Sequence, residues 1–284
     1  MQRSSRELGQ PIATGRTSSV YAFGAGAVVK VPGPEVPADW PAREARHTRA
    51  VRALGAPAPD VLDLVQIDGR DAVVFERIDG PSMWELLCAD PARGRELGGE
   101  LGRIHSDILS AGVPLGVGSL VDRLALNLDQ VGLFDAAERA AAHERLAVLP
   151  QGAALLHGDL HPGNVLMRGD GPVVIDWFDA AIGHPVADVV RSSLLLRPFV
   201  PLTERPHTPG ASAEMLTALH AGYVRSMGAM LTSTTSDVSL WEAVVAASRL
   251  AEGAEIDEAP LLAIWRDHRR GDEPQPGLAR WLAG

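Results

Sequence analysis

Five polar side chains that could form a catalytic centre lie within a span of 20 residues: His157, Asp159, His161, Asn164 and Asp176. Carboxylate and amide oxygens bind Mg²⁺, and a carboxylate can also accept or orient a hydroxyl proton. Short apolar runs flank these residues, and Gly and Pro mark the turns between them. The apolar runs are Ala153–Leu156, Val165–Met167 and Pro172–Ile175. This layout of loop, strand, tight turn and strand predicts that Asp159, Asn164 and Asp176 face one cleft.

The spacing resembles the catalytic loop of the aminoglycoside phosphotransferase-like branch of the protein-kinase-like superfamily, which also holds choline kinases and several sugar and metabolite kinases. That loop has the form His-x-Asp-x-x-x-x-Asn, and His157, Asp159 and Asn164 stand at this spacing. Asp176 stands where kinases place their magnesium-binding Asp. The branch replaces the Arg of His-Arg-Asp with Gly, as Gly158 does, and Asp-Phe-Gly with Asp-Trp, as Asp176-Trp177 does.

The resemblance implies transfer of the γ-phosphoryl group of ATP to a hydroxyl of a small molecule. Asp159 would act as the base, and Asn164 and Asp176 would bind Mg²⁺ across the phosphates. ATP and Mg²⁺ are therefore the expected cofactors.

Two other interpretations of the loop remain open. Asp, Asn, Gly and Pro are common in any turn, so the loop could be a set of turn residues with satisfied hydrogen bonds. Alternatively, His157, Asp159, His161 and Asp176 could be the ligands of a zinc hydrolase. His157 on its own is expected to brace the loop, and His161 has no assigned role.

Lys30 is the single lysine among the 26 basic residues. It lies in the apolar run Val28–Val31, where a cation is costly unless it faces a cleft. The resemblance implies that Lys30 holds the α- and β-phosphates and that Glu44, on a following helix, is its ion-pair partner. Lys30 could instead guard a strand edge against aggregation, and Glu44 could lie on a solvated basic helix face.

Two further segments are expected to contact the nucleotide. The small-polar loop before Val20 contains Thr17, Ser18 and Ser19, and its backbone N–H groups could point at phosphate oxygens. The segment after the second predicted hairpin resembles the hinge of the family, where backbone groups near Glu76 and Ile78 bind the adenine.

The predicted fold class is α+β, a bilobal protein-kinase-like fold with a small antiparallel N-lobe and a larger, mostly helical C-lobe. Residues 1–78 form the N-lobe and residues 79–284 the C-lobe. The N-lobe strands are expected at Pro11–Ala13, Val20–Phe23, Ala27–Val31, Val61–Ile67 and Ala72–Ile78. One helix, capped by Asp39, should run from Trp40 to about Leu54.

After Pro81 the hydrophobic period changes from two to about 3.6. A helix from about Arg93 to Leu109 should carry a buried face and a structural His105. Its glycines Gly98, Gly99 and Gly102 do not follow a strand, so they are not a dinucleotide-binding motif. The resemblance also implies that Asp188 braces the catalytic loop. Further helices are expected at about 187–197, 211–232, 238–252 and 259–268.

Length and composition suit a globular protein of 284 residues with 46% apolar residues. The lone Cys88 excludes an intrachain disulfide and favours a cytoplasmic location. No apolar run is long enough to suggest a membrane span. A net charge of −10 argues against nucleic acid as a partner and is compatible with a cationic acceptor. The chain is expected to be a monomer or a homodimer.

The most favoured acceptor is an aminoglycoside-type antibiotic, which implies a role in antibiotic resistance. A metabolic kinase for a sugar, amino sugar or amino alcohol shares every motif. A catalytically inactive nucleotide-binding module is a third possibility, although Asp159, Asn164 and Asp176 are all present. No activation loop follows Asp176, which disfavours a kinase of proteins. An acidic cluster could receive ammonium groups or be a solvated helix end: Glu252, Glu255, Asp257 and Glu258.

Overall fold

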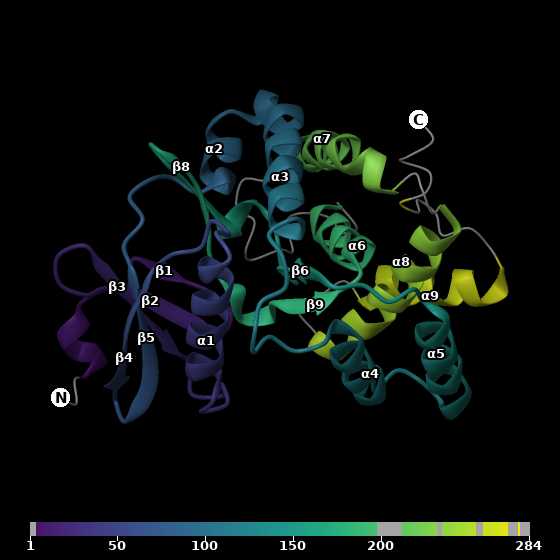
Figure 1. Cartoon of the computed structure of the whole chain (residues 1–284), viewed down its shortest axis with the longest axis horizontal. Coiled ribbons are helices and arrows are strands. Elements are labelled where there is room, and N and C mark those ends of the chain that lie inside the picture. The colour runs from purple at the N-terminus through teal and green to yellow at the C-terminus, as the bar shows by residue number, and fades with distance from the viewer. Residues whose placement is uncertain (1–3, 198–211, 232–234, 254–257, 272–277, 279–284) are drawn as a thin grey trace.

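The apolar runs near the N-terminus form one antiparallel sheet in the computed structural model of the protein (Figure 1). The structure describes residues 4–197, 212–231, 235–253, 258–271 and 278. The strands follow the order β1-β2-β3-β5-β4, which confirms the expected five-stranded sheet. Their bounds are β1 (Ala13–Thr14), β2 (Ser18–Ala22), β3 (Ala27–Pro32), β4 (Val61–Ile67) and β5 (Arg70–Glu76).

The strand ends differ from the expected ones where backbone pairing outweighs side-chain pattern. Strand β2 begins at Ser18 because Ser18 pairs with Pro32, so only Gly15 to Thr17 remain as a loop. Strand β5 ends at Glu76 and not at Ile78. The hairpin turn between β4 and β5 was predicted correctly. Asp68 and Gly69 both have positive φ, as a two-residue type I′ turn requires.

Helix α1 (Trp40–Ala53) is the helix expected in the N-lobe, with Pro41 in its first turn. Asp39 is the N-cap residue, as predicted, but its side chain makes no capping hydrogen bond to the helix. The buried Ala45 packs with Val73 and Phe75 of β5, which fixes the helix on the sheet. The neighbouring Glu44 is also buried and faces the interior between the lobes.

The C-lobe is mostly helical (Figure 1). Its helices are α2 (Met83–Ala89), α3 (Gly94–Leu109), α4 (Leu120–Gln130), α5 (Ala136–Val148), α6 (Pro185–Leu196), α7 (Ala213–Leu231), α8 (Thr235–Arg249) and α9 (Glu258–Arg270). Where a helix was expected by residue range, the observed bounds agree to within a turn. Among the described residues, no helix has the length and apolarity needed to cross a membrane.

Two short strand pairs carry the segment from Ala154 to Gly183, called the catalytic segment because it contains the predicted catalytic loop, through the helices. Strands β7 (Val165–Arg168) and β8 (Gly171–Val174) form the predicted hairpin. Strand β6 (Ala154–Leu156) pairs with β9 (Ala181–Gly183), a pairing that was not predicted because each strand has only three residues. The chain between the lobes docks on β7, and a Cβ at Gly80 would lie 2.3 Å from the Met167 carbonyl oxygen.

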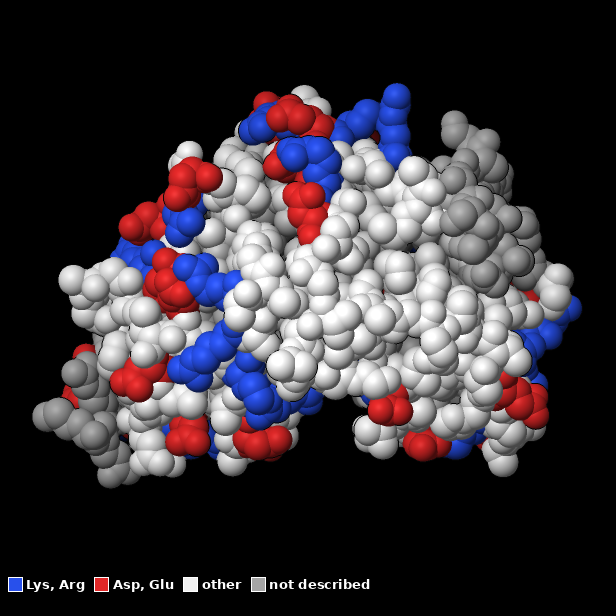
Figure 2. Space-filling view, viewed as in Figure 1, with Lys and Arg blue, Asp and Glu red and all other residues white. Residues whose placement is uncertain are grey.

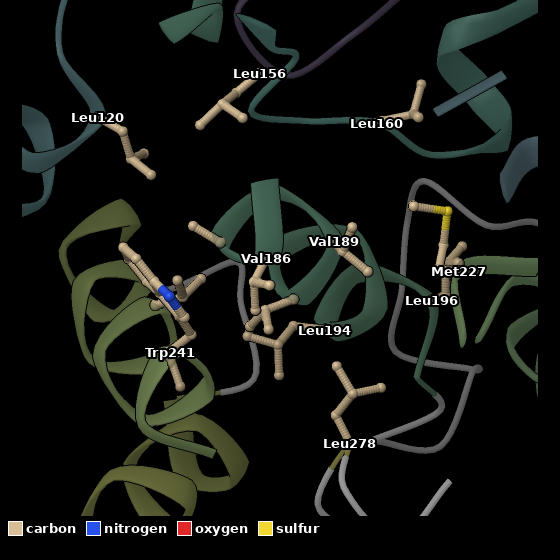
Figure 3. Close-up of a cluster of buried hydrophobic side chains, with 14 of the residues drawn as sticks. Leu120, Leu156, Leu160, Val186, Val189, Leu194, Leu196, Met227, Trp241 and Leu278 are labelled. Carbon is tan, nitrogen blue, oxygen red and sulfur yellow. The ribbon is translucent and has the colours of Figure 1, made fainter. Parts of the chain in front are cut away.

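The main core surrounds α6, which is buried on most of its circumference. Figure 3 shows side chains of α6 packed among those of α7, α8 and the catalytic segment. The residues around it include Leu156, Leu160, Met227 and Trp241. Because α6 also carries Asp188, this packing fixes the position of a carboxylate under the catalytic loop.

Three glycines allow α3 and α7 to pack at short distance. A Cβ at Gly98 would lie 2.0 Å from the carbonyl oxygen of Leu219, and one at Gly222 would lie 2.1 Å from that of Arg95. At Gly102 the nearest atom would be Cβ of Ser226 at 2.5 Å. Gly98 and Gly102 therefore serve helix packing, in agreement with their rejection as part of a dinucleotide-binding motif.

We predict that Gly98→Ala lowers the free energy of unfolding by roughly 1 to 3 kcal/mol, because the new methyl group meets backbone that cannot rotate away. The matched control is Gly99→Ala, where nothing lies within 4 Å of the added Cβ. It should be neutral or stabilising by up to about 1 kcal/mol, since Ala favours the helix. Urea denaturation followed by circular dichroism measures both, and equal effects would contradict the packing explanation.

Candidate active site

Gly158 gives the catalytic loop its direction. It lies two residues after the end of β6 and has a φ of 82°, a conformation that glycine adopts at little cost. A Cβ at this position would also lie 2.3 Å from the carbonyl oxygen of Asp179. Any larger residue at position 158 would therefore displace the loop from the segment that follows Asp176.

Asp188 braces this loop from below, as predicted. Its carboxylate accepts hydrogen bonds from the backbone N–H groups of His157 at 2.7 Å and Gly158 at 2.9 Å. His105 Nε2 lies 3.1 Å from the same carboxylate, and its Nδ1 lies 2.7 Å from the Tyr223 hydroxyl, which confirms the structural role expected for His105. Burial alone would raise the pKa of Asp188, but His105 and these donors lower it.

His157 lies inside the loop with both ring nitrogens engaged. Nδ1 accepts the N–H of Asp159 at 3.1 Å, so Nε2 carries the proton and donates to the Ile175 carbonyl at 3.0 Å. Burial lowers the pKa of His157, which keeps the ring neutral. Neither nitrogen can ligate zinc without breaking a backbone contact. Among the described residues, no group of three His, Cys, Asp or Glu side chains is placed to hold a metal ion.

Lys30 lies between two carboxylates. Its Nζ is 2.8 Å from Glu44 Oε1, so the expected ion pair is present, and 2.9 Å from Asp176 Oδ1. Burial opposes the charge of Lys30, but Asp176 and Glu44 outweigh it and raise the pKa of Lys30. Burial raises the pKa of Glu44 to about 6, which leaves it ionised at neutral pH. The single lysine is therefore an ion-pair centre and not a strand-edge guard.

Asn164 and Asp176 provide the oxygen atoms that a divalent cation would need. Asn164 Nδ2 donates to the Asp159 carbonyl at 2.9 Å, which leaves Oδ1 as its free acceptor. Asp176 has a left-handed backbone, with φ of 65°, and its side chain is 40% exposed in the cleft. Mg²⁺ in nucleotide sites takes one or two carboxylates and completes its shell with phosphate oxygens and water. The donor set of these two residues fits that requirement.

Asp159 faces the cleft beside Arg191 of α6. Arg191 Nη2 lies 3.4 Å from Asp159 Oδ1, and Arg191 Nε donates to the Gly158 carbonyl at 3.0 Å. Burial would raise the pKa of Asp159, but the neighbouring His161 and Arg191 lower it to about 2. His161 Nε2 lies 3.8 Å from Asp159 Oδ2, which is a contact that the sequence did not suggest.

Arg191 also pairs with Glu252, so a cation of the protein already compensates this carboxylate. Arg249 Nε approaches the second oxygen of Glu252 at 3.7 Å. Glu255 and Asp257 lie outside the described residues, and Glu258 begins α9. The sequence contained one signal for Arg191, since it lies one helical turn after Asp188.

The site residues line one cleft of about 1420 Å³ between the lobes, which includes Asp159, Asn164 and Asp176. Thr17 and Ser18 line this cleft as well, whereas Ser19 lies further along β2 and is not in its lining. Arg16 of the same loop donates from Nη1 to the carbonyl of Glu252 at 3.2 Å, which joins the two lobes.

The hinge residues lie apart from this lining. The N–H of Glu76 is engaged by the Asp60 carbonyl at 2.9 Å, and that of Arg77 by the Gly26 carbonyl at 2.9 Å. Within the described residues, the N–H of Ile78 has no backbone acceptor. Adenine binding through the N–H of Glu76 would need a broken sheet contact, so the Glu76 carbonyl and the Ile78 N–H remain the candidate groups.

Aromatic contacts hold α1 against the segment after Asp176. The rings of Trp40 and Phe178 lie 4.2 Å apart, and the Arg43 guanidinium lies 4.5 Å from the centre of the Phe178 ring. His47 Nδ1 is 3.1 Å from the Phe178 carbonyl oxygen. These contacts fix Glu44, on the same helix, at its distance from Lys30.

Comparisons with known proteins agree with this geometry. The model of the phosphotransferase enzyme family matches residues 9–223. No curated protein matches the chain in sequence. Three solved structures with the same fold are an amicoumacin kinase in complex with AMP-PNP and Ca²⁺, a choline/ethanolamine kinase family protein from Mesorhizobium loti, and a thermostable mutant of an aminoglycoside phosphotransferase with ADP and hygromycin B.

Their similarity to this chain is structural. The amicoumacin kinase has a TM-score of 0.58 at 16% identity and covers 98% of this chain and 91% of its own. The choline/ethanolamine kinase family protein has a TM-score of 0.54 at 19% identity, with coverages of 97% and 92%. The aminoglycoside phosphotransferase has a TM-score of 0.56 at 16% identity, with coverages of 98% and 92%. At these identities the comparison shows the fold, a bilobal protein-kinase-like one.

We predict that Asp188→Asn lowers the free energy of unfolding at neutral pH by roughly 2 to 4 kcal/mol, because an amide cannot replace a buried carboxylate that accepts several hydrogen bonds. Asp107→Asn, an exposed change on α3, is the control.

The same variant tests the pH dependence of stability. Because folding lowers the pKa of Asp188, its contribution is present above the unfolded value of about 3.9 and is lost as pH falls through the lower folded value. The difference in free energy of unfolding between the parent and Asp188→Asn should therefore become smaller in acid. A difference that stays constant down to pH 2 would contradict this assignment.

Proposed function

The chain belongs to the phosphotransferase enzyme family, and from this premise we propose that it transfers the γ-phosphoryl group of Mg²⁺·ATP to a hydroxyl of a small molecule. The observation that carries the proposal is the position of Lys30 between Glu44 and Asp176, in a cleft that Asp159 and Asn164 also line. A buried cation and several oxygen donors around one cleft match what phosphoryl transfer needs.

Each residue has a distinct part in this proposal. Asp159, ionised because its pKa is low, accepts the hydrogen bond of the acceptor hydroxyl and orients it. Asn164 and Asp176 would hold Mg²⁺, which neutralises phosphate charge when bound. Lys30 binds phosphate oxygens from the other side, with Glu44 keeping its ammonium group in place. Positioning and charge neutralisation then account for catalysis without a covalent intermediate.

The loop of small residues from Gly15 to Ser18 is proposed to cover the phosphates, with Thr17 and Ser18 facing the cleft. The Glu76 carbonyl and the Ile78 N–H are proposed to bind the adenine. For Ser19, contact with the phosphates is proposed from the sequence alone.

An aminoglycoside-type antibiotic is the first acceptor class that we propose. Asp122 supports it, because this exposed carboxylate lines the cleft and makes no ion pair with any described residue. A second candidate, a metabolic amino sugar or amino alcohol, is favoured by the pairing of Asp179 with Arg123 and of Glu252 with Arg191. These pairs leave fewer free carboxylates than a polycation would use.

We predict that Asp159→Asn lowers the rate of transfer by roughly a hundredfold or more, since an amide cannot accept the hydroxyl proton. The purified protein would be incubated with Mg²⁺·ATP and a panel of aminoglycosides, macrolides, peptide antibiotics, amino sugars, choline and homoserine. Mass spectrometry then detects a product heavier by one phosphoryl group.

The control for this screen is Asp170→Asn, an exposed carboxylate in the turn of the β7–β8 hairpin, which should keep full activity. Full activity of Asp159→Asn would refute its role as the base. Absence of transfer to every acceptor and to water, with nucleotide binding intact, would support an inactive binding module instead.

We also predict that Lys30→Ala lowers kcat/KM for ATP by roughly ten- to a hundredfold, the effect of losing charged hydrogen bonds to phosphate. Glu44→Gln, which leaves the ammonium in place but frees it to move, should have a smaller effect. Both variants need a thermal melt beside the kinetics, because Lys30→Ala leaves the buried Glu44 without its cation and Glu44→Gln leaves Lys30 with Asp176 as its one remaining carboxylate among the described residues. Unchanged kinetics in a folded Lys30→Ala variant would remove Lys30 from the nucleotide site.

A further inference from the structure

A second, smaller cavity of about 260 Å³ lies between α1 and the segment that precedes α4. We call it the arginine pocket, because Arg43, Arg46 and Arg123 line it together with His47. The rest of its lining is glycine, serine and alanine, and its described lining includes no Asp or Glu. A cavity below the roughly 300 to 1,000 Å³ of sites for drug-sized ligands suits a small ion or a single chemical group.

The charges in the arginine pocket are only partly compensated by the protein. Among the described residues, no carboxylate lies within ion-pair distance of Arg43 or Arg46. Arg43 stacks on Phe178, and Arg46 is exposed. Arg123 Nη1 does have a partner, Asp179 Oδ1 at 3.5 Å. Burial, with Arg191 and Arg43 nearby, lowers the pKa of Arg123 despite that partner. Bringing three guanidinium groups to one cavity is unfavourable unless an anion joins them.

The end of α4 adds to the positive potential. Gly118 and Ser119 line the cavity and lead directly into this helix of 11 residues. Ser119 caps the helix through its hydroxyl, which accepts the N–H of Asp122. The remaining N–H groups of the first turn and the helix dipole favour a negative charge at this N-terminal end, and Asp122 in the same turn supplies part of that charge.

Two other arginines of α1, Arg49 and Arg52, lie outside the arginine pocket and serve for comparison. Arg52 pairs with Asp60, and Arg49 is exposed and lines neither the large cleft nor the arginine pocket. In Figure 2, basic side chains gather over α1 beside the hollow between the lobes. The basic residues of this helix thus form two groups. Arg49 and Arg52 lie outside the pocket, whereas Arg43 and Arg46 line it together with Arg123.

We propose that the arginine pocket binds an oxyanion, a phosphate or carboxylate group, held by Arg46 and Arg43 from α1 and by Arg123 from α4. The bound group joins the N-lobe helix that carries Glu44 to the C-lobe. The pocket shares Arg43, Ser119 and Arg123 with the large cleft. Two sources of the same chemistry therefore fit: a separate small anion, or an anionic group of the molecule that is phosphorylated.

Inorganic phosphate is the probe for the first test. Thermal unfolding is followed while phosphate replaces chloride at constant ionic strength, for the parent, Arg46→Gln and Arg49→Gln. A ligand that binds only the folded protein raises Tm with its concentration. We expect Tm to rise in the parent and in Arg49→Gln, and the phosphate concentration needed in Arg46→Gln to be at least tenfold higher.

No rise in the parent, or equal rises in Arg46→Gln and Arg49→Gln, would overturn the proposal. Arg46 and Arg49 are both exposed on one helix, so each substitution should leave the fold intact. The test needs no turnover, and its result is therefore independent of the proposed kinase activity.

The second measurement separates the two sources of the anion. Kinetics are measured with an acceptor from the screen in phosphate-free buffer. If the acceptor carries the anion, Arg46→Gln should raise KM for the acceptor at least tenfold and leave KM for ATP unchanged. A separate anion predicts that both KM values equal those of the parent until phosphate is added. Arg49→Gln should match the parent in both cases.

Discussion

The arrangement of the two lobes depends on the ammonium group of Lys30. Three parts of the chain meet at this group. Strand β3 supplies Lys30, α1 supplies Glu44, and the turn after β8 supplies Asp176. A buried ammonium is costly unless oxygen atoms satisfy it, so the N-lobe helix and the C-lobe turn cannot separate without exposing or orphaning this charge. The contact of Trp40 with Phe178 acts at the same junction through packing. The relative position of the lobes is thus set by charge and by aromatic burial together.

Three carboxylates in or next to the catalytic segment are stabilised in three different ways, which separates their functions. Asp188 is fully enclosed and satisfied by backbone N–H groups and His105, so it can only support the loop. Asp176 is held by Lys30 and remains partly open to the cleft, where a cation could reach it. Asp159 faces Arg191 with part of its surface open. Sequence position alone does not distinguish the three residue environments. They follow from what each carboxylate contacts.

Local spacing explains why much of this was predictable. His157, Asp159 and Asn164 lie within one loop, and the strand pattern around Lys30 is short-range, so their grouping follows from the sequence. Arg191 and Glu252 meet from positions 61 residues apart, and Arg123 meets Asp179 across 56 residues. Those contacts depend on how α4, α6 and the end of α8 pack, which no local pattern encodes. The glycines of α3 show the same limit. The sequence excluded one function for them, but their role in packing required the partner helix.

Net charge is a poor guide to what this site binds. The chain carries −10, yet guanidinium groups gather where α1 and α4 meet, and arginines neutralise Asp179 and Glu252 beside Asp159. Charges beyond about 8 Å are screened at physiological ionic strength, so local grouping decides the potential that a ligand meets. A cationic acceptor would approach Asp122 on the rim of the cleft, while an anionic group would find Arg46 and Arg43. An acceptor with both a cationic and an anionic group could pair with Asp122 and with these arginines at the same time. A uniformly acidic cleft could not bind the anionic group.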